Sequence, residues 1–131
     1  MRGERDLDRL IRGMEPVLHP DTFVFATTTD DGIAAMPAVM RFQEAEGVTL
    51  IVTAGDARAA GLEGAFPSRM ITLNIHSSLD AVGFMARIIA RLAAEEMGVN
   101  PVAGYFHDHL FVPEGRVDDA MRVLSQMAAG G

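Results

Sequence analysis

Cysteine is absent from this sequence, and aromatic residues make up only 6% of its 131 residues. The lack of cysteine excludes disulfides and thiolate chemistry. Basic side chains are also few. The formal net charge is −7 and no stretch gathers the cations that phosphate contacts need, which argues against nucleic-acid binding. No apolar run approaches the roughly 18 residues of a membrane span, and the N-terminus is charged rather than signal-like. We therefore expect a cytoplasmic protein that binds neither membranes nor nucleic acid.

The most informative stretch is residues 70–98. Residues 70–75 present an apolar side chain at every second position, which predicts a half-buried strand. Ser77 and Asp80 then have the spacing of a capping box, which marks a helix start. From Leu79, apolar residues recur every three or four positions, which predicts a long amphipathic helix that ends at Gly98. Gly83 in its first turn indicates a packing contact or a close approach by backbone or ligand.

A hairpin and a second amphipathic helix are expected next. Residues 102–106 and 109–112 are short apolar runs separated by a reversal near His107 and Asp108, which predicts two antiparallel strands. Apolar side chains at helical spacing over residues 117–127 predict the helix. The whole chain, with 49% hydrophobic residues, is large enough for one core or for two small fused lobes.

The first half of the chain contains shorter predicted elements. A helix should begin near Asp6, and β-branched or aromatic runs predict strands at residues 22–29, 38–43 and 48–52. Thr53 and Asp56 repeat the capping spacing, which predicts a short helix that ends at Gly61. Residues 64–68 should form a linker into the strand at 70–75, and His19 should lie in a surface loop.

These elements and particular residues resemble the ACT domain, a βαββαβ module. The stretches LNIHSSLDAVG (73–83) and VAGYFHDHLFVP (102–113), with residues 6–8 and 42–50, are similar to a small bacterial group of ACT-type proteins. The resemblance implies an α+β protein with two ferredoxin-like lobes, at 1–66 and 67–131. Antiparallel sheets would have helices packed on one face, and the first lobe would lack its first helix.

The resemblance also implies a function. It predicts a non-catalytic regulatory module that binds a small effector such as an amino acid, without a cofactor, where the strand at 70–75 meets the long helix. The implied ligand-binding residues are His76, Ser77, Ser78, Leu79, Asp80, Gly104, His107 and Asp108. A helix start there would favour a carboxylate, with Asp80 as the partner of an amino group. A homodimer is expected because ACT sheets join side by side and the chain ends on a helix without the closing strand.

Two departures from the group and three alternatives remain. Pro101 stands where the group usually has an apolar strand former, so the strand should start after it or lie at a sheet edge. Phe106 replaces a common tyrosine and removes a possible hydroxyl contact. The chain could instead be an interaction module without a ligand, or a metal-binding protein that uses His76, His107 and His109. Catalysis by Ser77 or Ser78 with His76 is not favoured, because sequence neighbours rarely have that geometry.

Overall fold

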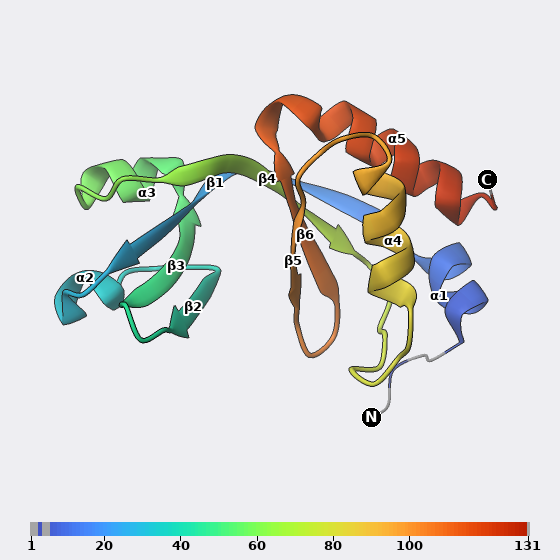
Figure 1. Cartoon of the computed structure of the whole chain (residues 1–131), viewed down its shortest axis with the longest axis horizontal. Helices are drawn as coiled ribbons and strands as arrows, with labels where there is room; N and C mark the ends of the chain where they lie inside the picture. Colours follow the sequence, from blue (N-terminus) through green and yellow to red (C-terminus); the bar gives the residue numbers. More distant parts are fainter. Residues whose placement is uncertain (1–2, 4–5, 131) are drawn as a thin grey trace. The chain divides into compact units, whose positions relative to one another are not determined.

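A computed structural model describes residue 3 and residues 6–130 of the chain. Its contacts divide the chain into two compact units (Figure 1). Unit 1 comprises Met1–Pro20 and Arg69–Gly131, and unit 2 comprises Asp21–Ser68. Strands β1 (Pro16–Thr28) and β4 (Ala65–Leu73) each pass from one unit into the other. The contacts group the first 20 residues with the C-terminal half. This is a different kind of division from domains along the sequence, so the domain boundary between residues 66 and 67 stays a prediction.

Unit 1 is a four-stranded sheet covered on one face by helices. Its strand order is β1–β4–β6–β5, and β5 (Asn100–Ala103) pairs antiparallel with β6 (Asp108–Pro113). The helices are α1 (Leu7–Gly13), α4 (Phe84–Ala93) and α5 (Val117–Ala128), with the 3-10 turn η1 (Glu114–Arg116) before α5. Alternate residues of β4 and β6 face the helices, so the core contains Ile71, Leu73, Leu110 and Val112 with Leu10, Ile88, Leu92 and Leu124.

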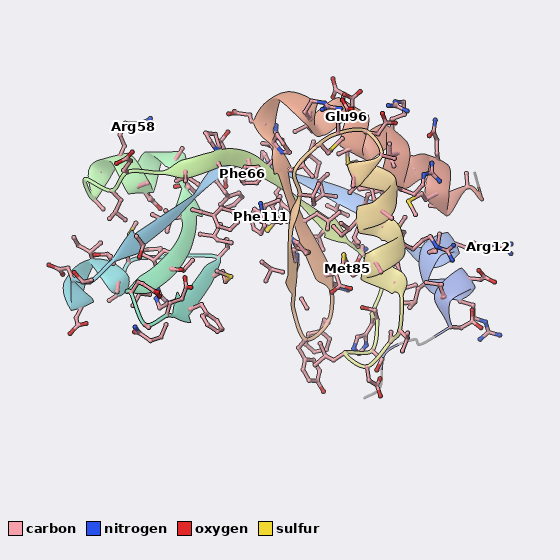
Figure 2. All side chains as sticks on the ribbon, in the orientation of Figure 1. Arg12, Arg58, Phe66, Met85, Glu96 and Phe111 are labelled. Carbon is pink, nitrogen blue, oxygen red and sulfur yellow. The ribbon has the colours of Figure 1, made fainter. Side chains whose placement is uncertain are left out.

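Unit 2 repeats the plan with smaller helices. Its strand order is β2–β3–β1–β4, and β3 (Val48–Thr53) pairs antiparallel with both β2 (Met40–Gln43) and β1. Helix α2 (Asp31–Ala34) is a single turn and α3 (Ala54–Ala59) is short. The amide of Asp56 donates to the Thr53 hydroxyl over 3.1 Å, so the predicted cap of α3 is confirmed. A side-chain packing contact of this unit joins Phe25 and Phe66, whose ring centroids lie 5.9 Å apart (Figure 2).

The predicted α+β class, with antiparallel strands and helices on one face, is confirmed. In place of the first helix of the N-terminal lobe there is only the single turn α2. One expectation is wrong: unit 1 does not lack a fourth strand. The first residues of β1 lie beside β4, where the guanidinium of Arg69 donates to the His19 carbonyl over 2.9 and 2.8 Å. The segment that contains Pro16 and Pro20 is therefore a strand rather than a loop.

The start and the end of the long helix differ from prediction. Helix α4 begins at Phe84, not at Leu79, and no side chain caps it. The capping box does not form, because both Ser77 and Asp80 lie before the helix; the Ser77 hydroxyl donates to Asp108. Gly83 lies before the helix, with a φ of 87° that favours glycine. The helix ends at Ala93, and Glu96, not Gly98, has a positive φ beyond it.

Two further boundaries also differ. Residues 64–68 are not a linker, because β4 already begins at Ala65. The hairpin turn covers residues 104–107, earlier than predicted, and the Gly104 amide donates to the His107 carbonyl over 2.9 Å. Pro101 lies within β5, which is an edge strand. This agrees with the expectation that a strand containing Pro101 would have to lie at a sheet edge. The remaining predicted strands and helices are present with ends shifted by a few residues.

Replacing Gly83 with alanine should lower the free energy of unfolding by about 1–2 kcal/mol, because a side chain is disfavoured in the left-handed conformation. Urea denaturation measures the change. Gly98→Ala is the matched control: Gly98 has no positive φ, and nothing lies within 4 Å of an added Cβ. Equal stability of the two variants would contradict this role of Gly83.

Candidate functional site

The candidate site lies where β4 leads into α4, at residues 76–83. This segment is tied to the β5–β6 hairpin by two hydrogen bonds. The Ser77 hydroxyl donates to the carboxylate of Asp108 over 2.9 Å, and the Nδ1–H of His107 donates to the Ile75 carbonyl over 3.1 Å. Ser77 is buried, with 8% of its surface exposed. The two segments that the sequence analysis assigned to the ligand site are therefore joined by long-range hydrogen bonds, and their role in binding stays a prediction.

A pocket of about 220 Å³ opens beside this junction. It is lined by four of the eight predicted residues, namely Ser77, Ser78, Leu79 and Asp108. Phe84 and Met85 at the start of α4 complete one wall, and Pro101 and Ala103 of β5 another. Figure 2 shows the Met85 side chain extending from α4 toward the hairpin. The sequence analysis missed the lining residues of α4 and β5, because only the tertiary fold brings them to the pocket.

The two ends of the pocket have opposite electrostatic character. Helix α4 has ten residues and no side-chain cap, so the amides of its first turn and the positive end of its dipole favour an anionic group. Asp108 supplies a carboxylate on the hairpin side. A ligand that carries a carboxylate and a cationic group matches both ends.

The other four predicted residues lie around the pocket rather than in its lining. The His76 ring packs near Phe106 and Tyr105, with ring centroids 5.3 and 6.4 Å away. Asp80 is exposed and accepts a hydrogen bond from the Ser78 hydroxyl. Gly104 and His107 form the hairpin turn, in which a Cβ on Gly104 would lie only 2.8 Å from the His107 carbonyl oxygen.

The backbone of Gly3 passes directly beside the candidate site. A Cβ on this residue would lie 2.5 Å from the carbonyl carbon of Ser77 and 2.5 Å from the amide nitrogen of Ser78. Such distances leave no room for a side chain, so only glycine fits here. The N-terminal segment at residue 3 therefore forms part of the surroundings of the Ser77–Ser78 turn.

A chain of polar side chains crosses the sheet of unit 1 beside the site. Thr72 Oγ1 lies 2.8 Å from His19 Nε2 and 2.9 Å from His109 Nδ1. Burial lowers the pKa of His109 below 6.5, the His107 and His19 charges lower it further, and Asp108 opposes them. The expectation that His19 lies in a surface loop is wrong, because β1 extends further than the sequence pattern indicates.

The residues named in the metal and catalytic alternatives do not come together in the part of the chain that the structure describes. Among residue 3 and residues 6–130, no group of three or more potential ligands is arranged to hold a metal ion. His76, His107 and His109 each contact different partners. Within the same part of the chain, neither Ser77 nor Ser78 donates to a histidine; their hydroxyls bond to Asp108 and Asp80.

The chain matches models of a known protein family. Residues 2–69 and residues 65–126 each match a model described as the ACT domain. The chain therefore belongs to the ACT-domain family and carries two such domains in tandem. It is of the regulatory, ligand-binding module type; ACT domains generally bind small-molecule effectors and often dimerise.

Solved structures share the fold. A protein of unknown function from Vibrio cholerae, described as a possible transport protein, is 35% identical, with coverage of 93% of this chain and 95% of that chain and a TM-score of 0.84. A protein from Agrobacterium tumefaciens is 12% identical over 88% and 89% of the two chains, with a TM-score of 0.73. The ligand-free regulatory subunit of aspartate kinase from Thermus thermophilus is 14% identical over 86% and 95%, with a TM-score of 0.65.

Neither a curated relative of the chain nor, among the residues described, a membrane-spanning helix is found. None of the curated proteins matches the chain by sequence. Within the residues that the structure describes, no helix combines the length and the apolar character needed to cross a bilayer.

The free energy of unfolding should fall as the pH is lowered below 6.5, because His109 binds a proton more readily in the unfolded chain. The loss should continue until the pH passes below the depressed pKa of the folded state. His109→Gln should flatten this part of the pH profile, measured by urea denaturation between pH 7.5 and about 5. His76→Gln should keep the decrease, and an unchanged slope in His109→Gln would refute the assignment.

Proposed function

We propose that the chain is a non-catalytic regulatory module that binds an amino acid, or a similar small effector, in the pocket beside residues 76–83. One observation carries the proposal: the first turn of α4 and the carboxylate of Asp108 line the same small pocket. An amino acid carries the two complementary charges on neighbouring atoms. The volume of about 220 Å³ is below the roughly 300–1,000 Å³ typical of sites for drug-sized ligands, which favours a small effector.

In this proposal each end of the ligand has a partner. The α-carboxylate accepts hydrogen bonds from the uncapped amides at the start of α4. The α-ammonium group donates to Asp108, whose orientation is held by the Ser77 hydroxyl. The ligand side chain lies against Leu79 and Met85. The carboxylate that we assign to the amino group is therefore Asp108, in place of Asp80, which is exposed and outside the lining.

The other predicted residues have supporting roles in this proposal. Gly104 and His107 shape the hairpin turn that positions Asp108. His76 and Asp80 lie in the segment between β4 and α4, where they border the Ser77–Leu79 wall. No cofactor is assigned to the site, because the acidic and amide groups suffice to hold a zwitterion.

Adding the right amino acid should raise the melting temperature of the chain. At a hundred times the dissociation constant the ligand adds about 2.7 kcal/mol to the free energy of unfolding. For a domain of this size that corresponds to a shift of several degrees. A thermal-shift screen of the standard amino acids measures it, and no shift with any of them would contradict the proposal.

The matched variants for this screen are Asp108→Asn and Asp118→Asn. Asparagine keeps the acceptor for Ser77 but removes the charge that the ammonium group needs, so the shift should be largely lost in Asp108→Asn. Asp118 lies exposed in the first turn of α5, outside the pocket, so Asp118→Asn should respond like the original chain.

A second candidate function is an interaction module that works without a small ligand. The observation that favours it is a group of exposed apolar side chains on the two loops of the site. The exposed fractions are 68% for Leu79, 84% for Val82, 61% for Tyr105 and 55% for Phe106. Exposed apolar groups of this kind mark interaction surfaces. A homodimer formed through this surface would bury them.

The apolar surface supports this dimer, whereas the missing closing strand no longer does, because β1 fills that sheet position. Light scattering should give twice the 14.1 kDa of one chain. Replacing both Tyr105 and Phe106 with serine should yield the monomer, because the apolar contact is lost. A monomeric starting protein, or an unchanged mass in the double variant, would exclude this interface.

A further inference from the structure

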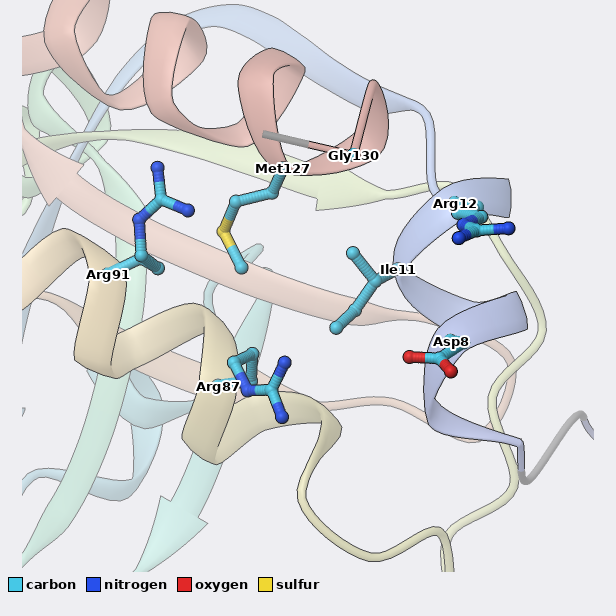
Figure 3. Close-up of a pocket in the computed structure, with 7 residues that line it drawn as sticks. All are labelled: Asp8, Ile11, Arg12, Arg87, Arg91, Met127 and Gly130. Atoms are coloured by element: carbon cyan, nitrogen blue, oxygen red, sulfur yellow. The ribbon is translucent and has the colours of Figure 1, made fainter.

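A second pocket of unit 1, of about 190 Å³, lies on the helical side (Figure 3). It is formed by α1, α4 and α5. Its apolar part consists of Ile11 and Met127, both buried. Three arginines also line it: Arg87 and Arg91 from α4, and Arg12 from α1. The pocket shares no lining residue with the one beside residues 76–83.

The charge of this pocket is opposite to that of the chain. With Asp8 as its one acidic residue, the lining has a formal charge of +2, whereas the chain carries −7. Arg87 and Arg91 lie one turn apart on α4, where like charges destabilise a helix by a few tenths of a kcal/mol. The stability of the helix therefore does not explain why these arginines are close together.

Outside this pocket, four of the six arginines that the structure describes have partners for their side chains. Arg41 and Arg69 donate to backbone carbonyls, and Arg116 and Arg122 pair with acidic side chains. Within residue 3 and residues 6–130, the guanidinium groups of Arg12 and Arg87 make no hydrogen bond or ion pair, whereas Arg91 is not free. Figure 3 shows Arg87 extending from α4 toward α1, and Asp8 extending from α1 toward the same space.

We propose that this pocket binds a small molecule that carries a doubly charged anionic group, a phosphate or a dicarboxylate, on an apolar body. Arginine is suited to this group because its planar fork matches the paired oxygens of carboxylate and phosphate. Arg87 holds the anion, and Arg12 and Arg91 add positive charge to the lining. Ile11 and Met127 cover the apolar body, and Asp8 accepts a hydrogen bond from a donor group of the ligand.

The test is the melting temperature of the full chain with inorganic phosphate, phenyl phosphate or succinate, at constant ionic strength held by sodium chloride. The expected result is a saturable rise with at least one of these anions, and a larger affinity for phenyl phosphate than for inorganic phosphate. Succinate separates the two sources: a response to succinate alone assigns a dicarboxylate, and a response to the phosphates alone assigns a phosphate ester.

Three variants make the test specific. Arg87→Gln keeps a good helix former and should weaken the apparent affinity about tenfold or more, because a charge-assisted hydrogen bond is lost. Asp8→Asn should strengthen binding, because it removes a negative charge from the lining. Arg58→Gln, an exposed arginine of α3 in unit 2, is the matched control and should bind like the original chain.

No saturable rise with any of the three anions would overturn the proposal. An equal response of Arg87→Gln and Arg58→Gln would also overturn it, because the rise would then be a general effect of salt. The proposal stands apart from the amino-acid site, since Asp108→Asn should keep the full response to the anion. Failure of one pocket is therefore distinguishable from failure of the other.

Discussion

The lateral pairing of β1 with β4 is the constraint on which both units depend. The first residues of β1 form the edge strand of unit 1, and its later residues form an inner strand of unit 2. β4 does the reverse, and the two strands are joined by side chains in each unit: Ser68 donates to the Phe23 carbonyl, and Arg69 to that of His19. Each unit contains one end of β1 and one end of β4, and unit 1 is assembled from two separate stretches of the chain.

Local signals predicted the elements that depend only on neighbouring residues. The Thr53 cap of α3, the helix over residues 117–127 and the hairpin of β5 and β6 are present because near-neighbour hydrogen bonds and periodic packing determine them. Elements that depend on distant partners were mispredicted. β1 runs through Pro16 and Pro20, since this part of the strand lies at the edge of the unit 1 sheet, where proline is tolerated. The Ser77–Asp80 cap is absent because α4 begins only at Phe84, and Ser77 instead donates to the distant Asp108.

The candidate site also contains residues that local sequence patterns indicate and residues that only distant contacts bring together. The resemblance identified both segments around the pocket, and four of the predicted residues line it. The residues that the resemblance missed are those whose positions near the pocket depend on tertiary contacts. Phe84 and Met85 line the pocket as the first residues of α4. The polar chain from His19 through Thr72 to His109 exists only because three strands lie side by side. The cluster of Arg12, Arg87 and Arg91 has no counterpart in the linear sequence for the same reason.

Helix α4 connects the two proposed ligands. Its first turn faces the pocket of Asp108, and one turn further on Arg87 and Arg91 face the other pocket. An anion between these arginines removes a repulsion that weakens the helix, and an ordered helix presents its first amides in a fixed direction. Each ligand would therefore favour the same ordered state of α4. Because coupling between two binding equilibria is reciprocal, an anion that strengthens amino-acid binding must be bound more strongly, by the same factor, when the amino acid is present.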